Sequence, residues 1–193
     1  YLDRLAHNYR ALRARAPRSK FVGLVKANAY GHGAVPVSRK LQQIGCDMLA
    51  VACAAEAAEL RQSGITIPIL CLGNTLPDYA SLLFRDDVIQ AVGDAETAAA
   101  LSEAAVREGI TLRIHLKLDT GMSRLGFFWG KDTDNTAVLE QLCGVFALPG
   151  LAVTGMFTHF SDADGSEEYT MEQFSRFLDA RDALARRGHT ISL

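Results

Sequence analysis

The hydrophobic and polar positions along the chain follow two alternating patterns. Short apolar runs bounded by turn residues are typical of buried strands, and apolar residues repeated every three or four positions are typical of amphipathic helices. Strands are predicted at 21–26, 47–52, 68–72, 88–92, 110–118 and 151–157, with a further strand beginning at 190–193. Helices are predicted at 2–14, 36–44, 54–62, 76–84, 94–108, 131–144 and 166–187.

This regular alternation predicts an α/β fold, either a doubly wound sheet or a (β/α)8 barrel. No G-x-G-x-x-G motif follows the first strand, which argues against a dinucleotide site. A barrel of this type takes about 250 residues. The chain has 193 residues and stops in its seventh predicted strand. We therefore expect residues 1–193 to form an incomplete TIM-type barrel, part of a longer protein.

The composition and charge of the chain argue against several kinds of binding partner. The formal net charge is −2, and because no long run of one sign occurs, nothing indicates a nucleic acid or a membrane surface. No apolar stretch approaches the length of a membrane span and no secretory signal is visible, so a cytoplasmic protein is expected. The cysteines form no C-x-x-C pair, which favours buried reduced thiols over a metal site. They are Cys46, Cys53, Cys71 and Cys143.

The first candidate for chemistry is Lys26, in the stretch FVGLVKANAYGHG at 21–33. The lysine ends an apolar run, and Tyr30 and the turn Gly31-His32-Gly33 follow. At the carboxyl end of a buried strand, partial desolvation lowers the pKa of a lysine, whose neutral amine can then form a Schiff base with an aldehyde. The alternative is a lysine that only ends a strand and reaches water.

The segment TLRIHLKLD, at 111–119, alternates between an apolar and a polar face. In a barrel the polar face would point inward, where charges must be paired or bound. The alternative is a half-solvated edge strand of an antiparallel sheet. Arg124 follows in a glycine-flanked loop, and its guanidinium suits a phenolate or carboxylate oxygen. His159 follows the strand at 151–157 and so would lie at the same end.

Three separate segments resemble the alanine racemase family of fold-type III pyridoxal-phosphate enzymes. They are VKANAYGHG at 25–33, LDTGMSRLGF at 118–127 and TGMFTHF at 154–160. The resemblance covers almost the whole chain but only about the first half of such an enzyme, its N-terminal barrel; the C-terminal β domain would lie beyond residue 193.

The resemblance implies a role for each matching residue. Lys26 would bind pyridoxal 5'-phosphate and act as the base on one face of the substrate. Tyr30 would donate to the cofactor phosphate, and His159 would lie near the pyridine ring. Arg124 would contact the ring oxygen of the cofactor and the substrate carboxylate. Lys117 matches a lysine that is often carbamylated in the family and could then hold Arg124.

The implied activity is interconversion of L-alanine and D-alanine, which supplies bacterial peptidoglycan synthesis. The parent enzyme would be a homodimer, with the second catalytic base supplied by the partner subunit, so this chain alone is expected to racemise poorly. A racemase of serine or another amino acid is one alternative. A non-catalytic, single-domain pyridoxal-phosphate-binding protein is another, and a barrel fragment too incomplete to bind anything is a third.

Overall fold

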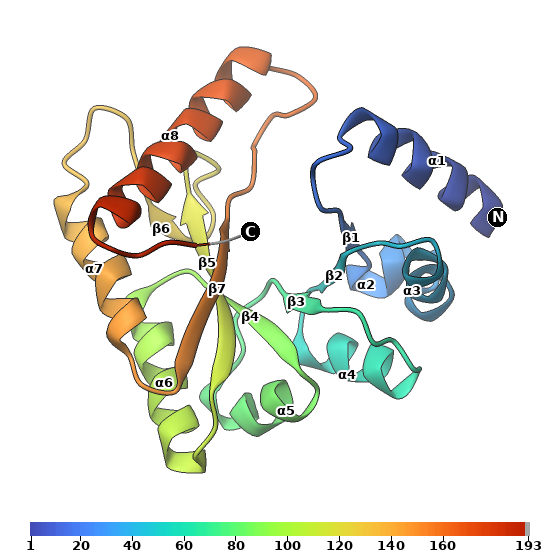
Figure 1. The fold of residues 1–193 in the computed structure, drawn as a ribbon, viewed down its shortest axis with the longest axis horizontal. Coiled ribbons are helices and arrows are strands. Elements are labelled where there is room, and N and C mark those ends of the chain that lie inside the picture. Colours follow the sequence, from blue (N-terminus) through green and yellow to red (C-terminus); the bar gives the residue numbers. More distant parts are fainter. Residues whose placement is uncertain (192–193) are drawn as a thin grey trace. The chain divides into compact units, whose positions relative to one another are not determined.

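The computed structural model of the chain describes residues 1–191, in which strands and helices alternate (Figure 1). The residues fall into two units, one formed by 1–75 with 82–90 and the other by 76–81 with the residues from 91 onward. Strand pairing within each unit is parallel. The predicted α/β class is therefore confirmed.

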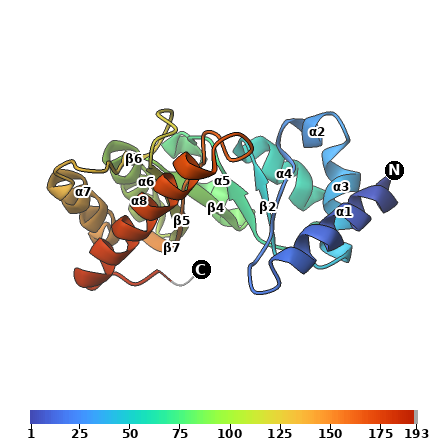
Figure 2. The ribbon, with the colours of Figure 1, turned by 90° about the horizontal axis from the view of Figure 1, so that it is seen from above.

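The first unit contains three whole strands and residues 88–90 of β4 (Val88–Val92), paired in parallel in the order β1, β2, β3, β4. Figures 1 and 2 show α1 beside α3 at the end of the unit that holds the N-terminus. Fully buried side chains of the strands and of α4, such as Leu49, Ile69 and Leu60, form the core. The elements are α1 (Leu2–Arg15), β1 (Val22–Leu24), α2 (Lys26–Tyr30), α3 (Ala34–Gln43), β2 (Met48–Val51), α4 (Ala54–Gln62) and β3 (Ile69–Cys71).

The second unit is built on the long strand β5, which pairs with β7 and, near its carboxyl end, with the short β6. Helix α7 packs against both α6 and α8 (Figure 1). The elements are η1 (Pro77–Tyr79), α6 (Ala95–Glu108), β5 (Leu112–Asp119), β6 (Phe127–Phe128), α7 (Thr136–Ala147), β7 (Leu151–Phe157) and α8 (Glu167–Arg186). Helix α5 (Ala80–Arg85) and strand β4 (Val88–Val92) each contain residues of both units.

Local sequence signals explain several element boundaries. The Asp94 carboxylate accepts a hydrogen bond from Thr97 N at 2.7 Å, so it caps α6. Ser166 caps α8 in the same way, through Tyr169 N at 3.2 Å. Helix α7 starts at Thr136 rather than at 131, because Asn135 ties the preceding loop to the backbone of Gly130.

Other boundaries also differ from the prediction. Strand β1 ends at Leu24, so Lys26 lies two residues beyond it, in a separate turn. The helix predicted at 76–84 begins as a 3₁₀ turn at Pro77, and β6 was not predicted. The strand expected at 190–193 does not begin at residues 190 and 191, and residues 192–193 lie outside the described part.

Both faces of β5 are buried, so the edge-strand alternative is wrong. The apolar face is fully buried, and on the polar face His115, Lys117 and Asp119 are buried as well. Cys46 and Cys71 are buried as predicted, whereas Cys53 is exposed and Cys143 is half-buried, which corrects the expectation for those two residues. None of the helices in residues 1–191 has the length and hydropathy that a membrane span needs.

His115 should make stability depend on pH. Its imidazole packs on the backbone of Gly155, and burial, aided by Arg113, lowers its pKa from 6.5 to about 4. The unfolded chain therefore binds the proton more readily, and stability falls as pH falls through this interval. We expect His115 to contribute a loss of about 3 kcal/mol in unfolding free energy.

Urea unfolding across this pH interval measures the effect. His115→Gln should flatten the pH dependence, while the same change at the exposed His32 should not. Equal slopes for the unsubstituted protein and His115→Gln would contradict the assignment.

Candidate functional site

The turn that carries Lys26 has an unusual backbone. Strand β1 makes a last hydrogen bond to β2 from Val25 N to Ala50 O, at 2.9 Å. Ala27, Asn28 and Ala29 then adopt φ of 51°, 53° and 53° with ψ of 49°, 43° and 45°, and Tyr30 has φ 54°. This is left-handed helical geometry, which costs about 1–2 kcal/mol for each residue other than glycine. Lys26 is thus followed by a strained turn.

Hydrogen bonds to two helices, α3 and α4, hold this turn in place. Glu56, in α4, accepts from Ala27 N at 2.8 Å through one carboxylate oxygen and from Ala52 N at 2.7 Å through the other. The Asn28 side chain accepts from Ala34 N at 2.8 Å, at the start of α3. Strained backbone of this kind persists only where its surroundings fix it, and it concentrates at functional sites.

The two glycines of the Y-G-H-G motif complete the turn. Gly31 and Gly33 have φ of 86° and 91°, a region that glycine enters at little cost. Gly33 N returns to Asn28 O at 3.0 Å and Gly31 N to Asn28 O at 3.1 Å. The motif therefore encodes the shape of the turn.

Lys26 and Tyr30 are brought together by this turn. Lys26 Nζ lies 6.0 Å from the centre of the Tyr30 ring, and the lysine is half-buried. The tyrosine is 62% exposed, so its hydroxyl can meet a ligand. A primary amine and a phenol beside exposed backbone suit an aldehyde that carries an anionic group.

In the second unit, Asp119 organises the loop that carries Arg124. Its carboxylate accepts from Gly121 N at 2.9 Å, Ser123 N at 3.0 Å and Arg124 N at 3.1 Å. Burial opposes ionisation of Asp119, but the three N–H donors outweigh it and hold the pKa of the carboxyl below its ordinary value. The backbone of Arg124 is thereby fixed, while its side chain is exposed.

Helix α8 holds the same loop from another side. Tyr169 Oη donates to Gly121 O at 2.9 Å, and Arg176 donates to Thr120 O at 2.7 Å. Between them, Gln173 donates to His159 O at 3.2 Å. The sequence predicts this helix at 166–187 but not its role in holding the loop, although polar residues at positions 169, 173 and 176 recur at the spacing of one helix face.

Lys117 is a buried amine with backbone partners. Its Nζ donates to Leu118 O at 2.6 Å and to Leu125 O at 3.2 Å, and it lies 5.7 Å from the centre of the Phe157 ring. Burial lowers the pKa of Lys117, although Asp119 opposes the change. Lys117 therefore adopts the neutral, unprotonated form more readily than a surface lysine does.

The predicted site residues lie in two groups, one in each unit. Lys26 and Tyr30 share the turn after β1. Arg124 and His159 follow β5 and β7, whose carboxyl ends are joined by a 2.8 Å hydrogen bond between the Thr120 and Thr158 hydroxyls. Within the second unit they lie at the same strand end, as predicted.

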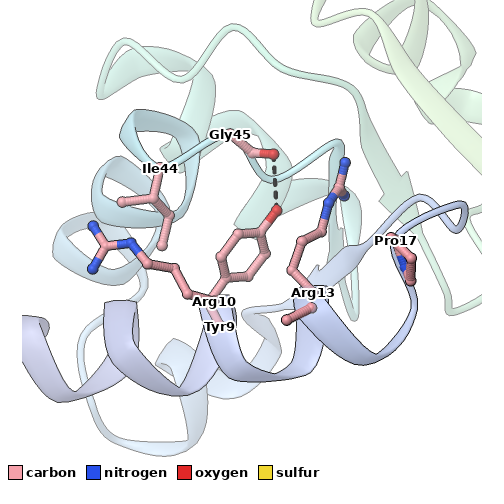
Figure 3. Close-up of a pocket in the computed structure, with 7 residues that line it drawn as sticks. Tyr9, Arg10, Arg13, Pro17, Ile44 and Gly45 are labelled. Atoms are coloured by element: carbon pink, nitrogen blue, oxygen red, sulfur yellow. Dashed lines mark hydrogen bonds between the residues drawn. The ribbon is translucent and has the colours of Figure 1, made fainter.

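A separate cavity of about 500 Å³ lies between α1 and the connection from α3 to β2 (Figure 3). Tyr9 Oη donates to Gly45 O across it at 2.8 Å, and Arg13 is paired with Asp47. None of the predicted site residues lines this cavity. Across the described residues, no three His, Cys, Asp or Glu side chains gather in a way that could hold a metal ion.

Comparison with known proteins identifies close relatives of the whole chain. Residues 1–193 match the family "Alanine racemase, N-terminal domain". The alanine racemase of Clostridium perfringens strain SM101 is 40% identical over 193 residues, which are 100% of this chain and 49% of that protein. The chain therefore spans about half the length of this relative.

Solved structures agree with the sequence match. The alanine racemase of a D-cycloserine-producing Streptomyces lavendulae is 34% identical with a TM-score of 0.87, covering 98% of this chain and 49% of the other. A histidine racemase from Leuconostoc mesenteroides subsp. sake is 27% identical with a TM-score of 0.82, covering 100% of this chain and 49% of the other. These matches confirm the predicted fold, an incomplete (β/α)8 barrel.

Asp119→Asn should loosen the Arg124 loop. The amide replaces an acceptor oxygen by an N–H₂ group that faces N–H donors, so we expect a loss of about 1–3 kcal/mol in unfolding free energy. Hydrogen exchange followed by NMR should show faster exchange at the amides of Gly121, Ser123 and Arg124.

Asp134→Asn is the matched control, because that exposed carboxylate accepts from Thr136 N, outside the loop of Arg124. Unchanged exchange of the three loop amides in Asp119→Asn would show that the carboxylate does not order the loop.

Proposed function

This chain belongs to the alanine racemase family, as its N-terminal domain, and from that premise we propose that it is the lysine-bearing half of a pyridoxal-phosphate-dependent amino-acid racemase. One observation carries the proposal furthest. The lysine of the family motif lies two residues beyond the end of β1, and a strained turn held by contacts with α3 and α4 places it beside Tyr30.

The donor groups of the chain fit this cofactor. Lys26 offers a half-buried primary amine for the aldehyde, and the exposed Tyr30 hydroxyl can donate to the phosphate. Arg124 supplies a permanent positive charge for the phenolate oxygen of the ring. By resemblance, His159 borders the pyridine. When bound, pyridoxal phosphate withdraws electrons from the α-carbon of an amino acid and makes its proton acidic.

The residues of this chain would then bind the substrate carboxylate and transfer the α-proton on one face of the substrate. The Lys26 amine would remove the α-proton from one face of one enantiomer, and in the reverse reaction its protonated form would donate a proton to that face. Arg124 holds the substrate carboxylate through paired N–H donors, and the Asp119 carboxylate keeps the backbone of that arginine in place. Racemisation also needs an acid on the opposite face. We assign that group to the C-terminal domain of the partner subunit, so the parent protein would act as a homodimer.

Alanine is the substrate that the relatives favour, because the relative at 40% identity is an alanine racemase. The product would serve peptidoglycan synthesis in the bacterial cytoplasm. A racemase of another amino acid is the second candidate, supported by the histidine racemase that shares this fold at 27% identity. A binding protein without turnover is disfavoured by the ordered loop of Arg124, whose charge suits a substrate carboxylate.

Lys117 is proposed as a site of carbamylation. Carbon dioxide would add to the neutral amine, forming an N–C bond while the amine releases a proton to solvent. The lysine then becomes an anion that can pair with Arg124. Burial of Lys117 and its lowered pKa favour this reaction.

Incubation with carbon-13 bicarbonate tests this assignment by NMR. A carbamate signal should appear in the unsubstituted protein and vanish in Lys117→Ala, while Lys131→Ala, at an exposed position, retains it. A signal that persists in Lys117→Ala would refute the assignment.

The visible spectrum after addition of pyridoxal phosphate tests the role of Lys26. The protein should develop an absorption band that borohydride abolishes, and Lys26→Ala should lack it. Lys20→Ala is the control, because that lysine is exposed and lies in the same unit. Identical spectra for Lys26→Ala and the unsubstituted protein would exclude the proposed site.

Activity assays compare residues 1–193 with the full-length parent protein. Chiral chromatography of alanine should show turnover by the full-length protein and only trace turnover by residues 1–193. Near-normal turnover by this chain alone would refute the proposed need for a partner's acid.

A further inference from the structure

We propose that Glu56 is a positioning residue for Lys26. Its carboxylate locks the left-handed turn that directs the lysine side chain. The inference rests on the proposed function of Lys26, and it names a residue outside the three family-like motifs.

The geometry makes Glu56 a bridge between two strand ends. Strands β1 and β2 pair in parallel with Leu24 opposite Ala50, and Val25 N makes the last hydrogen bond between their backbones. Beyond that point Ala27 N and Ala52 N find no acceptor in the ladder. Each instead donates to a different oxygen of Glu56, at 2.8 Å and 2.7 Å.

The position of Glu56 in its helix favours a charged bridge. It is the third residue of α4, where the helix dipole stabilises a negative charge. Hydrogen bonds from N–H groups to a carboxylate are stronger than those between neutral partners. The carboxylate is therefore held by the helix that carries it as well as by its two donors.

Helix capping alone does not account for the contact with Ala27. A glutamate early in a helix often accepts from a backbone N–H just before the helix, which explains the bond to Ala52. The bond to Ala27 reaches across 29 positions of sequence instead. Ala27 is exposed, so water could satisfy its N–H, but water cannot tie this residue to β2.

The hydrogen bond from Ala27 to Glu56 affects the position of Lys26, because Ala27 is the next residue in the chain. A non-glycine residue leaves the left-handed region readily unless contacts hold it there. Without the bridge, the backbone after Lys26 can relax, and the amine then samples several positions. Formation of a covalent bond to the cofactor depends on holding the amine in one of them.

Three variants separate positioning from stability. Glu56→Gln keeps the size of the side chain but loses one acceptor and the charge. Glu56→Asp keeps the charge at the start of α4 but is too short to reach both donors. Glu59→Gln is the control, because Glu59 is exposed on the same helix.

Two readouts are combined with the thermal midpoint. The first is the apparent dissociation constant for pyridoxal phosphate, obtained from the borohydride-reduced adduct on the peptide that contains Lys26. We expect it to rise about tenfold in Glu56→Gln and Glu56→Asp, the change that loss of a hydrogen bond to a charged group produces. The second is hydrogen exchange, which should accelerate at the Ala27 amide in both variants and stay unchanged in Glu59→Gln.

The outcomes distinguish this inference from the proposed function. If the unsubstituted protein forms no adduct on Lys26, the proposed function fails and the positioning role fails with it. If the adduct forms with equal affinity in the unsubstituted protein and in Glu56→Asp, only the positioning role is overturned. A lower thermal midpoint with unchanged affinity would likewise make Glu56 purely structural.

Discussion

The constraint on which the first unit depends is the left-handed turn after β1. Four consecutive non-glycine residues, 27–30, have positive φ, which an isolated chain would avoid. Their conformation is maintained by the Glu56 carboxylate, by the Asn28 side chain and by two glycines that accept positive φ without strain. Because the turn begins at Lys26, the same contacts that stabilise the fold decide where the reactive amine points.

In the other unit a second carboxylate, that of Asp119, also orders a loop by accepting backbone hydrogen bonds. Asp119 ends β5 and gathers three backbone N–H groups, so the loop that carries Arg124 is ordered from its start. Helix α8 adds contacts to the backbone carbonyls of that loop. In both units an anionic side chain at or beside a strand end holds the backbone that presents a cation. This arrangement separates the half-buried Lys26 and the exposed Arg124, which would meet a ligand, from the carboxylates that order their backbone.

The sequence predicts much of this fold and part of the site. Short apolar runs locate six of the strands, and apolar residues at helical spacing locate most of the helices, because burial selects hydrophobic residues at those positions. Lys26, Tyr30 and Arg124 are recognisable from their motifs. Glu56 and Gln173 are not, because their partners lie 29 and 14 positions away and only the fold brings them together. The left-handed turn was also missed, since KANAY contains no glycine to indicate positive φ.

The most direct test of the central claim is to find which lysine binds the cofactor. The chain contains five, Lys20, Lys26, Lys40, Lys117 and Lys131. After reduction of the pyridoxal-phosphate complex with borohydride, mass spectrometry of the digested protein identifies the modified residue. We predict the label on Lys26 at stoichiometric cofactor, with the other four unmodified. A label spread over the surface lysines, or one found on Lys117, would contradict the assignment of the turn after β1 as the reactive centre.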